Sequence, residues 1–235
     1  MSISRIFGNA GHEDEAQWIS VSDLMAGLMV IFLFIAITYI RPILLIQNTI
    51  KEIVVTWQES EVEIYEALNS EFSDDLQKWD AVLEKETLSI RFQAPEILFD
   101  TATSNIKPEF QEILGEFFPR YLGTLYQFRE SIDEIRIEGH TSSEWEGAED
   151  SYDAYFKNME LSQARTRSVL EHGLRLQAVQ KLAPWARGRL TANGLSSSNP
   201  ILSEGLEDSD RSRRVEFRVR TNTKEQIVRV LETLE

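Results

Sequence analysis

Cysteine is absent from this chain of 235 residues. Its absence excludes disulfide bonds, thiolate zinc sites and an N-terminal cysteine carrying a lipid anchor, but it leaves the cellular compartment open. Histidine is scarce too, because only His12, His140 and His172 occur, far apart in the sequence. A histidine-rich metal site is therefore not expected.

Basic residues are few beside acidic ones. The chain has 24 Lys and Arg against 39 Asp and Glu, which gives a formal net charge of −15. Such a charge argues against direct nucleic-acid binding. No nucleophile–base pair or phosphate-binding loop stands out, so the chain is not expected to be an enzyme. His140 is expected to make structural hydrogen bonds rather than to act as a catalytic base.

One apolar run is long enough to cross a membrane. It reads WISVSDLMAGLMVIFLFIAITYI from Trp18 to Ile40, and Asp23 is its only charge. At about 1.5 Å per helical residue, residues 19–40 extend about 33 Å, which matches a hydrocarbon core of about 30 Å. We predict a transmembrane helix over residues 18–41, after a short acidic arm over residues 1–17. The run is longer than the core of a signal peptide, so a retained anchor is expected.

Asp23 is the informative residue of this run. An ionised carboxylate costs roughly 2.5–3.5 kcal/mol near the centre of a spanning helix, and less near an end, unless it faces protein or water. Ala26 and Gly27, one turn further on, are small enough to let another helix approach closely. From the residues alone two interpretations stay open: a functional carboxylate inside an assembly, or an Asp at the membrane edge that caps the helix or contacts headgroups.

Residues 42–86 have the pattern of an amphipathic helical linker. Pro42 is predicted to kink or end the spanning helix, and apolar residues then recur at helical spacing, as at Ile46, Ile50 and Ile53. This segment either packs on the folded domain or is a gating segment that pairs with a second copy of itself.

Residues 87–235 alternate between strand and helix patterns. Alternating apolar residues predict strands around Ile90, Ile137, Leu190 and Phe217. Helices are predicted over residues 109–122, over residues 160–174 and from residue 223 to the end, with loops over residues 142–157 and 196–210. The expected fold is one α/β sandwich, a mixed sheet with helices on one face.

Five segments of this region occur in a characteristic order: ILFDTATSNIKPE (97–109), IRIEGHTS (135–142), NMELSQARTRSV (158–169), LTANGLSSSNPI (190–201) and DRSRRVEFRV (210–219). Together they resemble the OmpA-like peptidoglycan-binding domain. The GHT turn followed by an N-x-x-L-S-x-x-R helix is the most specific part of the resemblance.

The resemblance implies a peptidoglycan ligand, the stem peptide of the diaminopimelate type. It places Arg165 on a carboxylate of that peptide, beside Asn158 and Leu161, and a guanidinium offers a carboxylate a planar two-pronged fork. Thr141 and Ser142 in the turn are further expected contacts. The alternative for Arg165 is a solvated or salt-bridged helix residue.

Two positions in the resemblance leave questions open. Arg213 and Arg214 match the basic pair of the family, and each is equally expected to touch ligand or to bridge to an acid of the sheet. The family usually has Asp where this chain has Ser142. The loop beyond carries acidic residues, one of which could supply the missing charge; otherwise ligand binding is weak, altered or lost. They are Glu144, Glu146, Glu149, Asp150 and Asp153.

The spanning helix resembles that of MotB-type stator subunits. Its sequence S-x-x-D-L-M-A-G-L-M-V-I-F-L places Asp23 on the ion-carrying aspartate of that family. Within this group the SVSDLMAGLMVIFLFI helix and the GHTSSEW turn most resemble the ZorB family, the MotB-like component of Zorya anti-phage defence systems.

These resemblances imply a motor. They imply a homodimer inside a multi-pass MotA/ZorA-like membrane partner, with Asp23 carrying the ion, a proton rather than sodium, and no bound cofactor. They place the chain in the bacterial inner membrane, with residues 1–17 in the cytoplasm and residues 87–235 in the periplasm. The orientation comes from the resemblance alone. The basic residues Arg5, Arg41 and Lys51 lie on both sides of the helix and do not decide it. A flagellar stator subunit and a passive tether without ion flow are the alternatives.

Overall fold

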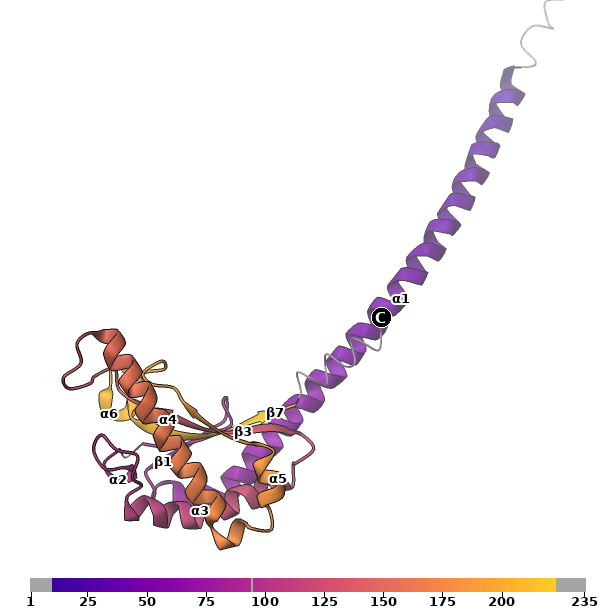
Figure 1. Cartoon of the computed structure of the whole chain (residues 1–235). Helices are drawn as coiled ribbons and strands as arrows, with labels where there is room; N and C mark the ends of the chain where they lie inside the picture. Colours follow the sequence, from indigo (N-terminus) through magenta and orange to yellow (C-terminus); the bar gives the residue numbers. More distant parts are fainter. Residues whose placement is uncertain (1–9, 94, 223–235) are drawn as a thin grey trace, which may run out of the picture. The chain divides into compact units, whose positions relative to one another are not determined.

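The structure of the chain is a computed structural model that describes residues 10–93 and 95–222 (Figure 1). It divides into two compact units, the first reaching Val54 and the second beginning at Val55. Helix α1 (Ala10–Leu76) contributes to both. The helix predicted from residue 223 to the end lies outside the described residues.

The first unit contains the candidate membrane span. Its 21 residues, Val21–Arg41, are long and apolar enough to cross a membrane, and none of them is buried within the chain. Large side chains such as Met25, Phe32 and Phe34 are exposed. A helix that is apolar all round must bury its surface in lipid or in other proteins. Helix α1 does not end at Pro42, so that part of the prediction is wrong.

The second unit is built on a five-stranded mixed sheet in the order β1-β2-β7-β3-β4. Its strands are β1 (Ala81–Glu84), β2 (Ser89–Phe92), β3 (Ile132–His140), β4 (Leu190–Gly194) and β7 (Arg214–Thr221). Only β3 and β4 pair in parallel. The expected strands are confirmed, and β1 is an additional edge strand that the sequence pattern did not predict.

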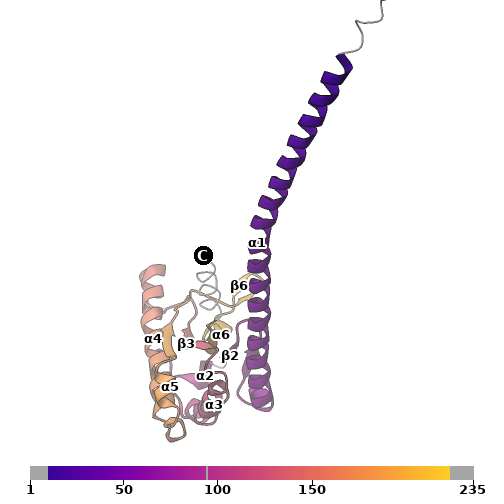
Figure 2. The same cartoon turned by 90° about the vertical axis from the view of Figure 1, so that its right-hand side faces the viewer.

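Helices and short segments complete this unit. The helices are α2 (Pro95–Leu98), α3 (Pro108–Tyr126), α4 (Ser151–Arg175), α5 (Ala183–Arg187) and α6 (Ser209–Ser212), with a single turn η1 (Gln177–Val179) and a hairpin of β5 (Leu202–Ser203) and β6 (Leu206–Glu207). Figure 2 shows α3, α4 and the end of α1 beside the strands.

The core lies between the helices and one face of the sheet. Alternate strand residues such as Ile137 and Phe217 point into it, since successive side chains of a strand point to opposite faces. Phe117 of α3 occupies its centre and lies 4.9 to 6.0 Å, between ring centroids, from five other aromatic rings. These rings belong to Phe72, Trp79, Phe92, Tyr121 and Phe217.

The boundary expected at residue 86 is wrong. Ile64, Leu68 and Phe72, from the end of α1, are fully buried in the same core as the sheet. Arg120 of α3 also reaches this end of α1, with its Nε 2.6 Å from the Oε1 of Glu71. The last part of the supposed linker therefore belongs to the folded domain, which matches the interpretation that this segment packs on the domain.

The loop expected over residues 142–157 is also too long. Helix α4 begins at Ser151, because the side chain of Asp150 accepts a hydrogen bond from the backbone N–H of Asp153, 2.8 Å away, and so caps the helix. The loop expected over residues 196–210 contains the β5–β6 hairpin and the start of α6.

Replacing Phe117 by Ala should lower the free energy of unfolding by roughly 3–5 kcal/mol, because it opens a cavity in the aromatic cluster. Phe156→Ala is the matched control, since that ring is 65% exposed. Chemical denaturation of the purified full chain, followed by tryptophan fluorescence, measures both. Equal losses in the two variants would contradict this view of the core.

Candidate functional site

Two glycines let helix α4 lie directly on the strands β3 and β4. A Cβ atom added to Gly194 would lie 2.3 Å from the backbone nitrogen of Gln163, and one added to Gly139 would lie 2.7 Å from the Cγ2 of Thr166. The side chain of Gln163 then bonds to the edge of β4, accepting from the N–H of Gly194 at 2.8 Å and donating to the carbonyl of Ala192 at 3.1 Å. The height of α4 above the sheet is thus fixed by backbone contact.

This placement brings most of the expected ligand residues together at one cleft of about 760 Å³. Five of the six line it, namely Thr141, Ser142, Asn158, Leu161 and Arg165. The first two follow β3 in the turn, and the other three follow one another along α4 at positions i, i+3 and i+7. The remaining lining residues are Phe99, Thr101, Ala102, Lys107, Glu144, Trp145, Glu146, Asp210 and Arg213.

Arg165 is held in this cleft by neutral groups. Its Nε donates to the carbonyl of Thr103 at 2.9 Å, its Nη2 donates weakly to that of Asp100 at 3.5 Å, and its guanidinium carbon lies 4.9 Å from the centre of the Phe99 ring. No carboxylate of the described residues pairs with it. Burial, and then the charge of Arg213, lower the pKa of Arg165 to about 10, so it remains charged at neutral pH.

Arg165 is half-buried, and even a partly desolvated cation without a counter-ion is unfavourable in a folded protein. Arg165 therefore has the properties of an anion-binding group, one that is already oriented and lacks only the negative charge. The interpretation of Arg165 as a salt-bridged helix residue does not match this geometry.

Asn158 fixes the turn against α4. Its side chain is buried, and its Nδ2 donates to the carbonyl of Glu144 at 3.2 Å. Leu161, half-buried, supplies an apolar wall between Asn158 and Arg165.

Arg214 does not reach this cleft. It is 6% exposed, its Nε donates to the Oε1 of Glu216 at 2.6 Å, and its Nη1 donates to two backbone carbonyls. It therefore bridges to an acid of the sheet, as one of the two expectations had it. Arg213, the other member of the expected basic pair, lines the cleft instead. Strand parity was the available signal, because Arg214 lies on the same face of β7 as Glu216.

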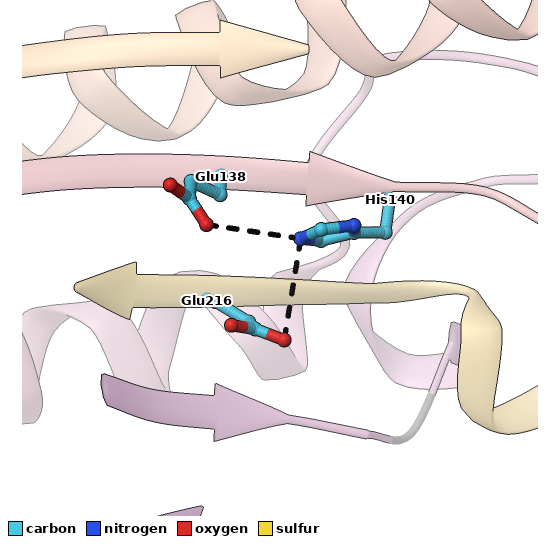
Figure 3. A group of neighbouring side chains, drawn as sticks. All are labelled: Glu138, His140 and Glu216. Carbon is cyan, nitrogen blue, oxygen red and sulfur yellow. Dashed lines mark ion pairs between the residues drawn. The ribbon is translucent and has the colours of Figure 1, made fainter. Parts of the chain in front are cut away.

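A second group of titratable residues lies on the sheet face opposite the core. Figure 3 shows Glu138 and His140 on β3 and Glu216 on β7, with the Nε2 of His140 4.0 Å from one oxygen of each carboxylate. Burial first, and then the charge of Arg214, lower the pKa of His140 to about 3, so the ring is neutral at ordinary pH. Neither ring nitrogen has a hydrogen-bond partner among the described residues, contrary to the expected structural hydrogen bond.

The donor atoms of this group are of the kinds that bind divalent metal ions, and they lie within 4.8 Å of one another. Guanidinium groups already compensate the two carboxylates, however. The Oε1 of Glu216 accepts from Arg91 at 3.0 Å and from Arg214 at 2.6 Å, while the Nε of Arg218 lies 3.6 Å from the Oε2 of Glu138. A metal ion would add positive charge among arginines, so this group is better explained as a structural ion-pair network.

Asp23 lies in the first unit, within the candidate membrane span, and its side chain is exposed on α1. It is the only charged residue between Val21 and Ile40. The structure therefore holds two separate candidate sites, the carboxylate of α1 and the cleft of the second unit.

No family model matches the sequence. Among curated proteins the chain is similar to the Zorya protein ZorB of Escherichia coli, with 45% identity over 221 residues that cover 94% of each chain. Among solved structures it is similar to a MotB-like protein from Desulfovibrio vulgaris, with a TM-score of 0.51, 24% identity, and coverage of 70% of this chain and 93% of that chain. This likeness confirms the fold. The periplasmic domain of Helicobacter pylori MotB is also similar, with a TM-score of 0.41 and 18% identity, covering 62% of this chain and 84% of that chain.

Replacing Glu216 by Gln should change how stability depends on pH. Burial by itself would raise the pKa of Glu216, but the hydrogen bond and charge of Arg214 lower it to about 2. A carboxylate with a depressed pKa stabilises the fold above its unfolded pKa of about 4.3 and loses that contribution as pH falls towards 2. The Glu216→Gln variant has no such carboxylate, so its free energy of unfolding should fall less than that of the wild type as the pH is lowered.

At neutral pH the same variant should be less stable by roughly 3–5 kcal/mol, because Arg214 is left buried without its partner. Glu171→Gln is the control, since Glu171 forms an exposed pair with Arg175 on α4 and should change stability by less than about 0.5 kcal/mol. Unfolding curves from pH 7 down to pH 2 measure both effects. An unchanged pH dependence in Glu216→Gln would contradict the assignment.

Proposed function

The chain belongs to the ZorB family of Zorya proteins, and from this premise we propose that it is a peptidoglycan-anchored, ion-conducting stator subunit of a rotary motor that acts in anti-phage defence. The membership rests on 45% identity over 94% of the chain, and it confirms the resemblance inferred from the two sequence motifs. One structural observation carries the proposal furthest: the half-buried guanidinium of Arg165, which has no counter-ion among the described residues, in a cleft of the second unit.

The cleft is the proposed anchor. Arg165 offers its two-pronged fork to a carboxylate of the peptidoglycan stem peptide, as the family resemblance implies. Its Nε and Nη2 face backbone carbonyls, which orient the guanidinium plane before ligand arrives. A group oriented in advance loses little conformational entropy on binding. Thr141, Ser142, Asn158 and Leu161 complete the wall against which the peptide lies.

The first unit is the proposed membrane segment, with residues 1–17 in the cytoplasm and the second unit in the periplasm. A single helix with an exposed carboxylate cannot line an ion path, and Asp23 needs protein or water around it. We therefore place two copies of the chain inside a multi-pass partner of the MotA/ZorA kind. Ala26 and Gly27 leave room for close helix contact beside Asp23.

Ion flow in this proposal is a cycle of loading and release at Asp23. A proton neutralises the carboxylate, which then tolerates an apolar surrounding, and its release restores the charge. A membrane potential supplies roughly 2.3 kcal/mol per charge per 100 mV, which biases the direction of the cycle. Each cycle steps the partner ring around the two copies, and the wall-bound cleft holds them against the torque.

Asp23→Asn should abolish ion flow and phage protection while the protein is still made and inserted, because the change keeps the size of the side chain and removes its charge. Thr38→Ala is the control in the same helix, since the Thr38 hydroxyl bonds only to the Phe34 carbonyl one turn earlier in the described structure, at 2.7 Å, and should leave both unchanged. Proton flux into vesicles and phage plating efficiency measure the two effects.

If Asp23→Asn showed undiminished flux or protection, the ion-conducting function would be contradicted, and a passive membrane-to-wall tether would be the remaining interpretation. Restored swimming in a strain that lacks its own stator subunit, with no effect on phage plating, would instead assign the chain to flagellar motility.

Arg165→Ala should weaken binding to purified sacculi by roughly tenfold or more, since a hydrogen bond to a charged group contributes about 1.5–3 kcal/mol. Arg165→Lys should weaken it less, because it keeps the charge and loses the fork. Arg167→Ala, an exposed arginine of the same helix, is the control and should bind as the wild type does. Co-sedimentation with sacculi measures all three, and unchanged binding of Arg165→Ala would remove the residue from the site.

A further inference from the structure

The cleft lacks an acid at the position where the family usually has one. Ser142 stands there, 4% exposed, and its hydroxyl carries no charge. The side-chain end of diaminopimelate carries an ammonium beside its carboxylate. If Arg165 binds the carboxylate, as proposed above, the ammonium still needs a negatively charged partner in the same cleft.

Three carboxylates line the cleft, those of Glu144, Glu146 and Asp210. Asp210 is already paired with Arg213 across one turn of α6. Glu144 and Glu146 form no ion pair with any residue that the structure describes. The cleft therefore holds an unpaired cation on α4 and unpaired anions in the loop after β3, which is the charge pattern that a zwitterion fits.

Of the two unpaired acids, Glu144 has the fixed backbone. Its carbonyl accepts a hydrogen bond from the buried Asn158 at 3.2 Å. On its other side the N–H of Ser143 donates to the Oε1 of Glu207 at 3.0 Å, and the Ser143 hydroxyl bonds to the second oxygen of the same carboxylate. Glu146 instead precedes Gly147, which has a positive φ of 75° in the tip of the loop. A carboxylate on a fixed backbone is the better-organised partner for a ligand.

Thr141 supplies an independent sign of a ligand. It is 3% exposed and lines the cleft, and its hydroxyl oxygen has no hydrogen-bond partner among the described residues. A buried hydroxyl without a partner is uncommon in folded proteins. A ligand that donates hydrogen bonds from an ammonium would satisfy this oxygen.

We propose that Glu144, with the hydroxyl of Thr141, takes the place of the acid that is missing at Ser142 and binds the ammonium of the ligand. Glu144 lies two residues after Ser142 along the turn, so the proposed acid is displaced by two residues from the position that the family usually uses. The loop after β3 thus takes over the role of the missing acid, and Arg165 keeps the other end of the ligand.

Two synthetic stem peptides test the subsite: one that ends in meso-diaminopimelate, and the same peptide with the side-chain ammonium acetylated. Binding of each to the detergent-purified full chain is measured by calorimetry. The wild type should prefer the free ammonium by roughly tenfold or more, because a charge-assisted hydrogen bond is lost on acetylation. Glu144→Gln should bind both peptides equally and weakly, and Thr141→Val should lose part of the preference.

The matched variant is Glu146→Gln, which removes the neighbouring carboxylate and should keep the wild-type preference. The subsite would be overturned if Glu144→Gln kept the wild-type preference for the free ammonium, or if Glu146→Gln alone lost it. Either result would leave the anchor proposal standing. Binding of both peptides to Arg165→Ala at wild-type strength would overturn the anchor proposal itself.

Discussion

The close contact between helix α4 and strands β3 and β4 is the constraint on which the site depends. Gly139 and Gly194 have no side chains, so the helix backbone rests on the strands, and Gln163 bonds to the edge of β4. With α4 at that height, Asn158 bonds to the turn after β3 and Arg165 bonds to the carbonyls of Asp100 and Thr103. The cleft is therefore a consequence of how tightly the sandwich packs.

Two arginines of the second unit lie in different surroundings, Arg214 buried and Arg165 half-buried. Arg214 is compensated by Glu216, and the network around Glu138 and His140 is balanced by further guanidinium groups. Arg165 contacts backbone carbonyls and an aromatic ring, and no carboxylate of the described residues pairs with it. A buried charge is stable in a fold where an opposite charge compensates it, so the first arrangement stabilises the sheet. The charge of Arg165 remains available to the proposed ligand, and this contrast distinguishes it from the structural Arg214.

Much of this could be predicted from the sequence, because strand alternation and the order of motifs are local signals. They gave the mixed sheet and the cleft residues of α4 and the turn. The errors arose where tertiary contacts decide. The end of α1 reads as a linker, but Phe72 packs against Phe117 in the core. Strand β1 forms only by pairing with β2. Of the basic pair only Arg213 reaches the cleft, because Arg214 lies on the face of β7 that carries Glu216. The role proposed for Asp23 depends on the proposed partner subunits, which no pattern within one chain describes.

The most direct measurement is a crystal structure of the chain bound to a stem peptide that ends in meso-diaminopimelate. The account predicts that a terminal carboxylate lies on the guanidinium of Arg165, within hydrogen-bond distance of two of its nitrogens, in the cleft between α4 and the turn after β3. A peptide bound elsewhere on the domain, with the Arg165 guanidinium still facing only the carbonyls of Asp100 and Thr103, would contradict it.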